Sequence, residues 1–177
     1  MTLLEFYNLQ DIMQMFGVDT STDKQLEEWG RKLKIEVQVL MADEVDDHIN
    51  RSSESSFSQG KRTKLSIINY QDSDEQGSHW VGYFNGEKEF EKGFEKDTAR
   101  KEPVSFYFDP YGIEPLPDFP KCIFNSVQVQ PFGTRLCGQL SLYFLFKMNK
   151  CECGNKSQKF DDIIEEMLDC LWPESLL

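Results

Sequence analysis

The chain has 177 residues, which is a usual length for one domain with one hydrophobic core. Its hydrophobic content of 39% is enough to form a core, so a disordered chain is excluded. The net charge of -12 disfavours nucleic acid and anionic membranes as partners, because no basic face can dominate the electrostatic field. No run of eighteen apolar residues and no signal peptide is found, so we expect no membrane association and an intracellular, reducing compartment.

The first quarter of the chain predicts two helices and a strand. Apolar residues recur at helical spacing over 9–16 and over 24–33, and they alternate with polar residues over 35–40. Acidic and serine-rich residues then interrupt the pattern at about 43–62. This polar loop is too short to divide the chain into two domains.

The middle of the chain predicts four strands. Strands are expected at 64–70, 79–84 and 104–108, and the alternation of Val and Gln predicts a further short strand at 127–130. A charged segment at about 87–102 follows an Asn-Gly turn and is expected to be a surface insertion.

The last part of the chain predicts two helices of different character. Residues 137–148 are apolar almost all round, which is typical of a buried helix, whereas 158–171 have one apolar face. We therefore predict an α+β fold in which residues 1–177 form a single domain, with a central mixed β-sheet, one buried helix and further helices packed around it.

The odd number of cysteines predicts free thiols in a chain that is not secreted. The five are Cys122, Cys137, Cys151, Cys153 and Cys170. Cys151 and Cys153 could supply half of a zinc site, but no second pair of ligands lies at a suitable spacing. We therefore expect no metal and no cofactor.

Cys137 is the candidate nucleophile, because it stands at the start of the predicted buried helix. A helix N-terminus and a nearby imidazole both favour the thiolate, which is the reactive form of cysteine. Gly138 beside it would leave room for the backbone of a substrate. A buried core cysteine at a helix start is the alternative interpretation.

A thiol enzyme also needs a base, and the chain has only two histidines, His48 and His79. His48 lies at the edge of the polar loop, where nothing fixes its ring. His79 starts a predicted strand, which is a rigid support, and the neighbouring Trp80 could shield the ring from water. Taken alone, His79 could equally be a packed strand residue, but in a thiol enzyme it is favoured over His48.

Two further residues could complete such a site. Asp109 ends the predicted strand 104–108, and its carboxylate could orient the imidazole. Gln130 lies seven residues before Cys137, and its amide could donate to the oxyanion of a tetrahedral intermediate together with the backbone N–H of Cys137. An Asp-Pro turn and an ordinary polar strand end are the alternative interpretations, and Gln128 is a rival for the second role.

These residues carry a family resemblance. The chain resembles adenovirus-type (adenain-like) cysteine proteases, especially those of Polinton/Maverick elements and related DNA viruses, and more distantly the SUMO-specific Ulp proteases. The shared motifs are Gly77-Ser78-His79-Trp80, Phe108-Asp109-Pro110-Tyr111-Gly112, and Gln130 followed by Cys137-Gly138. The resemblance implies a catalytic triad of His79, Asp109 and Cys137 with Gln130 as oxyanion donor, and cleavage after small residues such as Gly-Gly.

The chain also departs from the adenovirus enzyme. The segment between His79 and Asp109 is longer, because it contains the charged stretch 87–102. The adenovirus enzyme is activated by DNA and a short peptide, but the acidic composition here speaks against DNA. The sequence leaves open whether a peptide activator is a partner. Cys122 could form a disulfide with such a peptide, although a plain thiol is the simpler interpretation. Trp80 and Tyr111 are candidates for the cleft walls and could equally be core residues.

Three functions are compatible with these residues. The first is an endopeptidase that matures viral or mobile-element precursor proteins at Gly-rich sites, in the host cytoplasm or nucleus or packaged in a virion. The second is an isopeptidase that removes ubiquitin or a ubiquitin-like modifier, with the charged segments contacting the folded modifier. The third is a degenerate protease retained as a binding module.

Overall fold

The structure is a computed structural model that describes residues 7–50, 64–71, 79–86, 104–150 and 155–173. The predicted charged insertion at 87–102 lies outside the described residues, as do Gly77, Ser78 and the pair Cys151 and Cys153. The statements below concern the described ranges.

Four α-helices form where the apolar periodicity predicts them. They are α1 (Leu9–Phe16), α2 (Asp23–Lys32), α4 (Cys137–Asn149) and α5 (Lys156–Leu171). The first two begin with capping boxes, in which Asn8 pairs with Asp11 and Thr22 pairs with Gln25. Such a box satisfies two backbone N–H groups that have no partner inside the helix, so it fixes where the helix starts.

The described strands form one mixed sheet in the order β1-β2-β3-β4-β5. The strands are β1 (Val37–Leu40), β2 (Leu65–Asn69), β3 (Trp80–Phe84), β4 (Phe106–Phe108) and β5 (Ile123–Phe124). The outer pairs, β1 with β2 and β4 with β5, are parallel, and the two inner pairs are antiparallel. The fold class is therefore mixed α+β, as predicted.

The predicted strand at 127–130 is wrong. The backbone N–H groups of Val129 and Gln130 both donate to the Pro110 carbonyl oxygen, at 2.9 and 2.8 Å. Successive residues of a strand point their N–H groups to opposite sides, so one carbonyl cannot accept from both within a regular ladder. The fifth strand lies earlier in the chain, at Ile123–Phe124.

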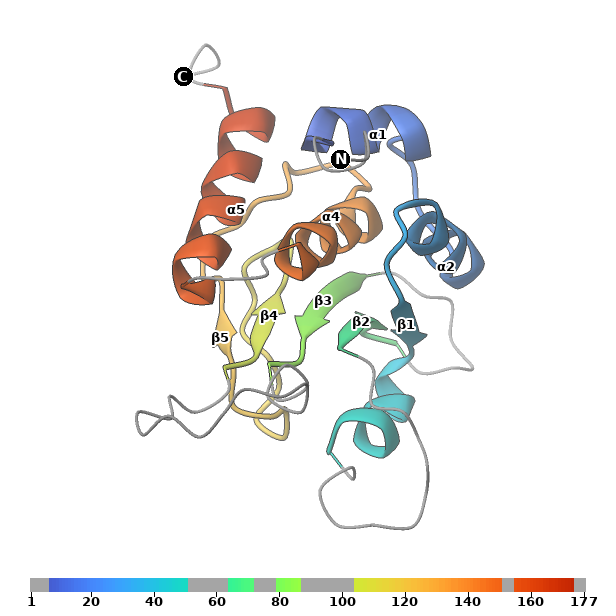
Figure 1. Ribbon diagram of the computed structural model, residues 1–177, viewed down its shortest axis with the longest axis vertical. Coiled ribbons are helices and arrows are strands. Elements are labelled where there is room, and N and C mark those ends of the chain that lie inside the picture. The colour runs from blue at the N-terminus through green and yellow to red at the C-terminus, as the bar shows by residue number, and fades with distance from the viewer. Residues whose placement is uncertain (1–6, 51–63, 72–78, 87–103, 151–154, 174–177) are drawn as a thin grey trace.

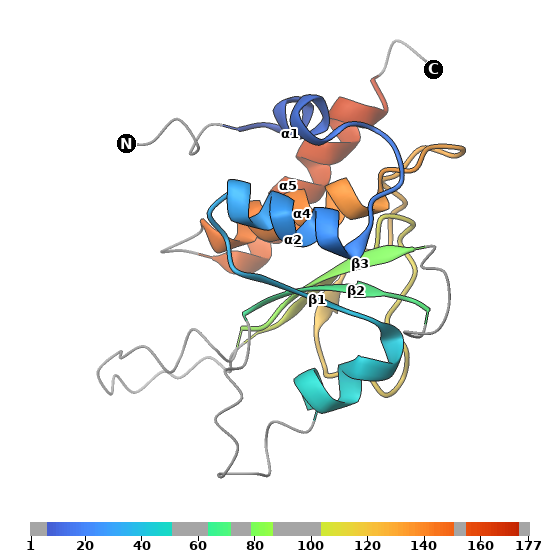
Figure 2. The same cartoon turned by 90° about the vertical axis from the view of Figure 1, so that its right-hand side faces the viewer.

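The helices cover one face of the sheet. Figures 1 and 2 show α1, α2, α4 and α5 on that face, and the short helices η2 (Ala42–Glu44) and η3 (Asp46–Asn50) on the other. Helix α4 lies between the strands β2 and β3 and the other three helices. As predicted it is buried nearly all round, with every residue of 137–146 buried. In the described ranges no helix combines the length and the apolar character needed to cross a bilayer.

Two features hold α4 closely against β3. A Cβ atom added at Gly82 would lie 2.7 Å from Cδ1 of Phe144, so a larger residue at this strand position would push the helix away. One turn nearer the start of α4, the Ser141 hydroxyl donates a hydrogen bond of 3.1 Å to the carbonyl oxygen of Trp80. The beginning of α4 is thereby attached to the beginning of β3.

We predict that Gly82→Ala destabilises the fold by about 1–3 kcal/mol, the usual cost of overpacking a core. Phe144 is fully buried and cannot retreat from the added methyl group. The measurement is chemical denaturation. Gly30→Ala is the matched control, because its Cβ would meet only ordinary contacts at 3.5 Å inside α2, where alanine favours the helix. Equal losses in the two variants would contradict the prediction.

Candidate active site

The candidate base and acid meet at one end of the sheet. His79 directly precedes β3 and Asp109 directly follows β4, and the antiparallel register of these strands brings both residues to the same edge. The Nε2 atom of His79 lies 3.0 Å from Oδ1 of Asp109, and it donates the hydrogen bond. Asp109 is fully buried and His79 is mostly so. The structure therefore brings these two predicted site residues together.

Asp109 is held in place by its neighbours. The Tyr111 N–H donates to the same carboxylate oxygen at 2.7 Å. The side chain of Asn125 accepts from the Asp109 N–H at 2.9 Å and donates to the Asp109 carbonyl at 2.7 Å. Because Asn125 directly follows β5, its amide extends the pairing between β4 and β5 by one residue. The sequence carried no signal for this role, since a single Asn after a short strand is common.

Two tyrosine rings enclose the His79 imidazole. Tyr70 lies opposite His79 beyond the end of β2, and its ring centroid is 5.4 Å from that of the imidazole. On the other side Tyr111 stacks at 4.8 Å. Both tyrosine rings lie within 28° of the imidazole plane. This arrangement fixes the plane of the base and shields it from water, which is the role expected of Trp80.

Cys137 reaches the same imidazole from the helical layer. It is the first residue of α4, and Leu136 provides no side-chain cap, so the first N–H groups of the helix stay available to the sulfur or to a substrate oxygen. Burial alone would lower the pKa of His79. Hydrogen bonding to Asp109 and Cys137, together with the charges of both, outweighs burial and raises the pKa to about 9.

The two ring nitrogens of His79 differ in their hydrogen bonding. Nε2 donates to Asp109. The other nitrogen, Nδ1, is buried and has no hydrogen-bond partner among the described residues. Because Nε2 is occupied, Nδ1 is the nitrogen open to a proton from Cys137, whose interaction with the ring raises the pKa of the imidazole. An imidazole placed between a carboxylate and a thiol can take a proton from the sulfur while the acid holds its tautomer.

Gln130 lies beneath Tyr111 rather than at an open surface. Its side-chain amide donates to the Thr134 carbonyl at 2.8 Å and to the Tyr111 hydroxyl at 3.3 Å. The rival candidate, Gln128, uses its amide to donate to the backbone carbonyl of Gln130 at 2.7 Å. Gln130 is therefore linked to the residues around His79, whereas Gln128 supports the loop.

The surroundings of Trp80 and Gly138 do not fit the contact with substrate that the sequence predicts for them. The Trp80 ring is buried in the core, and its N–H donates to the Ser21 carbonyl at 3.0 Å. A Cβ atom at Gly138 would lie 1.8 Å from the hydroxyl oxygen of Ser21. The space beside Gly138 is thus occupied by Ser21 and not by a substrate. Trp80 holds the segment between α1 and α2 to β3, and Gly138 allows the same segment to lie against α4.

The remaining candidates lie elsewhere. His48 is in η3, where its Nδ1 lies 2.9 Å from the side-chain nitrogen of Gln38. Burial raises the pKa of Cys122 to about 11, so this thiol stays protonated at neutral pH. Within the described ranges no group of three His, Cys, Asp or Glu side chains could hold a metal ion.

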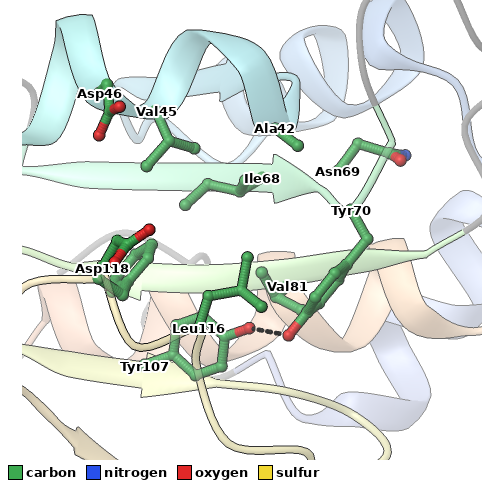
Figure 3. A pocket seen from close by; sticks show the side chains of 11 residues that line it. Ala42, Val45, Asp46, Ile68, Asn69, Tyr70, Val81, Tyr107, Leu116 and Asp118 are labelled. Atoms are coloured by element: carbon green, nitrogen blue, oxygen red, sulfur yellow. Dashed lines mark hydrogen bonds between the residues drawn. The ribbon is translucent and has the colours of Figure 1, made fainter.

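A pocket of about 180 Å³ lies on the sheet face opposite the main helices. Its lining includes Val45, Ile68, Leu116 and the ring of Tyr70. Figure 3 shows the Tyr70 hydroxyl joined to that of Tyr107 by a hydrogen bond, which is 2.7 Å long. Tyr70 therefore belongs both to this pocket and to the enclosure of His79.

Comparison with protein-family models found no match, and neither did comparison with curated protein sequences. The resemblance to adenain-like proteases is therefore a prediction from the motifs of this chain.

We predict that Asp109→Asn lowers the pKa of His79 from its wild-type value of about 9, because the variant removes the negative charge that favours the imidazolium. The folded pKa lies above the ordinary value of 6.5. Protonated His79 therefore adds to the free energy of unfolding below about pH 6.5, and this contribution is lost as the pH rises through 9.

An NMR titration of the imidazole signals measures this pKa, and a His48→Gln variant assigns them. An unchanged pKa in Asp109→Asn would show that the carboxylate does not control the base.

Proposed function

We propose that the protein is a cysteine endopeptidase with an adenain/Ulp-like fold. The observation that supports the proposal is the environment of His79, whose Nε2 donates to Asp109 and whose pKa is raised by both Asp109 and Cys137. A carboxylate, an imidazole and a thiol in that order form the usual machinery of nucleophilic acyl transfer. The mixed α+β architecture, with the thiol at the start of a buried helix, is compatible with such a fold.

The reaction follows from these positions. Cys137 transfers its proton to His79, and the sulfur attacks the substrate carbonyl carbon, so that a C–S bond forms and the carbonyl oxygen becomes an oxyanion. His79 then gives the proton to the leaving amine as the C–N bond breaks, which leaves a thioester on Cys137. A water molecule, deprotonated by His79, attacks the thioester and the thiol is restored. Asp109 holds the imidazole throughout.

The pKa of His79 suits this cycle. A pKa raised to about 9 makes the imidazole a stronger base, so it can hold the proton taken from Cys137 until the leaving amine accepts it.

The substrate class comes from the sequence resemblance. We propose an intracellular protein substrate cleaved after small residues, such as a viral or mobile-element precursor with Gly-rich sites. The net charge of -12 supports a neutral or basic substrate and argues against DNA as a cofactor.

We predict that a Gly-Gly peptide with a carbon electrophile at its C-terminus modifies Cys137 at neutral pH and leaves Cys122 unmodified. Cys122 has a pKa raised to about 11, so it offers very little thiolate at this pH. The label is located by mass spectrometry of the digested protein. Hydrolysis of a matching fluorogenic peptide is expected to be lost in Cys137→Ala and kept in Cys122→Ala.

The outcome separates the candidate functions. The proposal is refuted, and a binding module is favoured, if Gly-rich peptides neither label the protein nor are hydrolysed and Cys137 is itself unreactive. Labelling by ubiquitin or a ubiquitin-like protein carrying the same electrophile, without labelling by short peptides, would instead establish a deconjugating isopeptidase.

We predict that Gln130→Ala lowers kcat by about 10²–10³, the usual effect of losing one oxyanion donor. The matched control is Gln128→Ala, whose amide contacts only the backbone of the loop. Steady-state kinetics with the same peptide provide the measurement. If the two variants lose activity equally, the effect comes from loop stability and not from oxyanion stabilisation.

A further inference from the structure

Tyr111 contacts three of the four residues of the candidate site. Its backbone N–H donates to Asp109 at 2.7 Å, and its ring stacks on His79 at 4.8 Å. Its hydroxyl accepts from the amide of Gln130 at 3.3 Å. A tyrosine that only filled space beside the base would not need the last contact, because a phenylalanine ring would stack equally well.

Both hydrogens of the Gln130 amide already have acceptors. A primary amide has two N–H donors. One is directed to the Thr134 carbonyl and the other to the Tyr111 hydroxyl. Moreover, Gln130 is only 1% exposed, whereas Tyr111 is 36% exposed. A substrate that approaches this side of the site therefore meets the tyrosine before it meets the amide.

The Tyr111 hydroxyl has a hydrogen of its own to donate. A phenol is both donor and acceptor, and here the oxygen accepts from Gln130. The phenolic hydrogen bonds to no other residue in the described part of the chain, so it is free to turn toward the site. Donation from the amide also polarises the phenol and strengthens the hydrogen bond that it can give.

We propose that Gln130 and Tyr111 act as one hydrogen-bonding unit, in which the buried amide holds the Tyr111 hydroxyl and that hydroxyl donates to the substrate oxyanion. This inference rests on the proposed peptidase function and makes Tyr111 a further catalytic residue. Gln130 then becomes a positioning residue that acts through Tyr111, while the Thr134 carbonyl anchors the amide from behind.

Kinetics of single and double variants test the unit. Tyr111→Phe keeps the stacked ring and removes only the hydroxyl, so we expect kcat to fall by about a hundredfold with KM changed by less than about threefold. Because the two residues form one unit, their losses should not multiply. We expect the double variant Tyr111→Phe/Gln130→Ala to be at most about threefold slower than the slower of the two single variants. Tyr143→Phe is the control for loss of a buried hydroxyl, because it removes the hydroxyl that bonds to Glu166 between α4 and α5. This variant should keep the wild-type kcat.

Two kinetic results would overturn the inference. If Tyr111→Phe keeps wild-type kcat while Gln130→Ala loses it, the amide donates to the oxyanion directly. If the losses of the two single variants multiply in the double variant, the residues act independently.

A spectroscopic measurement separates this inference from the proposed function. The side-chain amide signal of Gln130, assigned by its loss in Gln130→Ala, should shift in Tyr111→Phe. It should stay in place in Tyr70→Phe, which removes the hydroxyl of the other stacked ring. An unmoved signal in Tyr111→Phe refutes the unit even if the enzyme is active, whereas a shifted signal in a protein that cleaves nothing would refute the peptidase and leave the hydrogen bond established.

Discussion

The close packing of α4 against β3 determines where the Cys137 sulfur lies relative to the His79 ring. Gly82 allows the approach, and the bond from Ser141 to the Trp80 carbonyl fixes it one residue from His79. On its other side α4 is held by Gln139, whose amide donates to the carbonyls of Gly17 and Asp19. Cys137 and His79 are thus positioned by the start of α4 and the start of β3, two elements that pack against each other.

The same edge of the sheet must also keep a carboxylate away from water. A buried carboxylate is costly unless it is hydrogen-bonded, and one oxygen of Asp109 accepts from both His79 and Tyr111. Asn125 fixes the backbone on which this carboxylate stands. The interactions that stabilise the charge are thus the ones that orient the base, so structural and chemical requirements coincide at this residue.

Much of this arrangement could be predicted from the sequence, because it depends on local patterns. The span 9–16 of α1, the burial of α4 and the strand ends at His79 and Asp109 follow from periodicity and turn residues. Contacts between distant segments could not be predicted in this way. The alternating segment 127–130 forms no strand because two of its N–H groups donate to the Pro110 carbonyl oxygen. Asn125 can bond to the backbone of Asp109 only because β5 lies beside β4. The catalytic roles themselves stay predictions.

The two rings around His79 have a consequence for the path of protons. A half-turn of the imidazole about its Cβ–Cγ bond would drive its edges through the Tyr70 and Tyr111 rings, which lie within 5.4 Å on either side, and would break the bond to Asp109. Such a turn would exchange Nδ1 with Cδ2 and Nε2 with Cε1, so the two stacked rings and the bond to Asp109 favour the present orientation of the imidazole. Because Nε2 stays bonded to Asp109, a proton that Nδ1 accepts is also released from Nδ1.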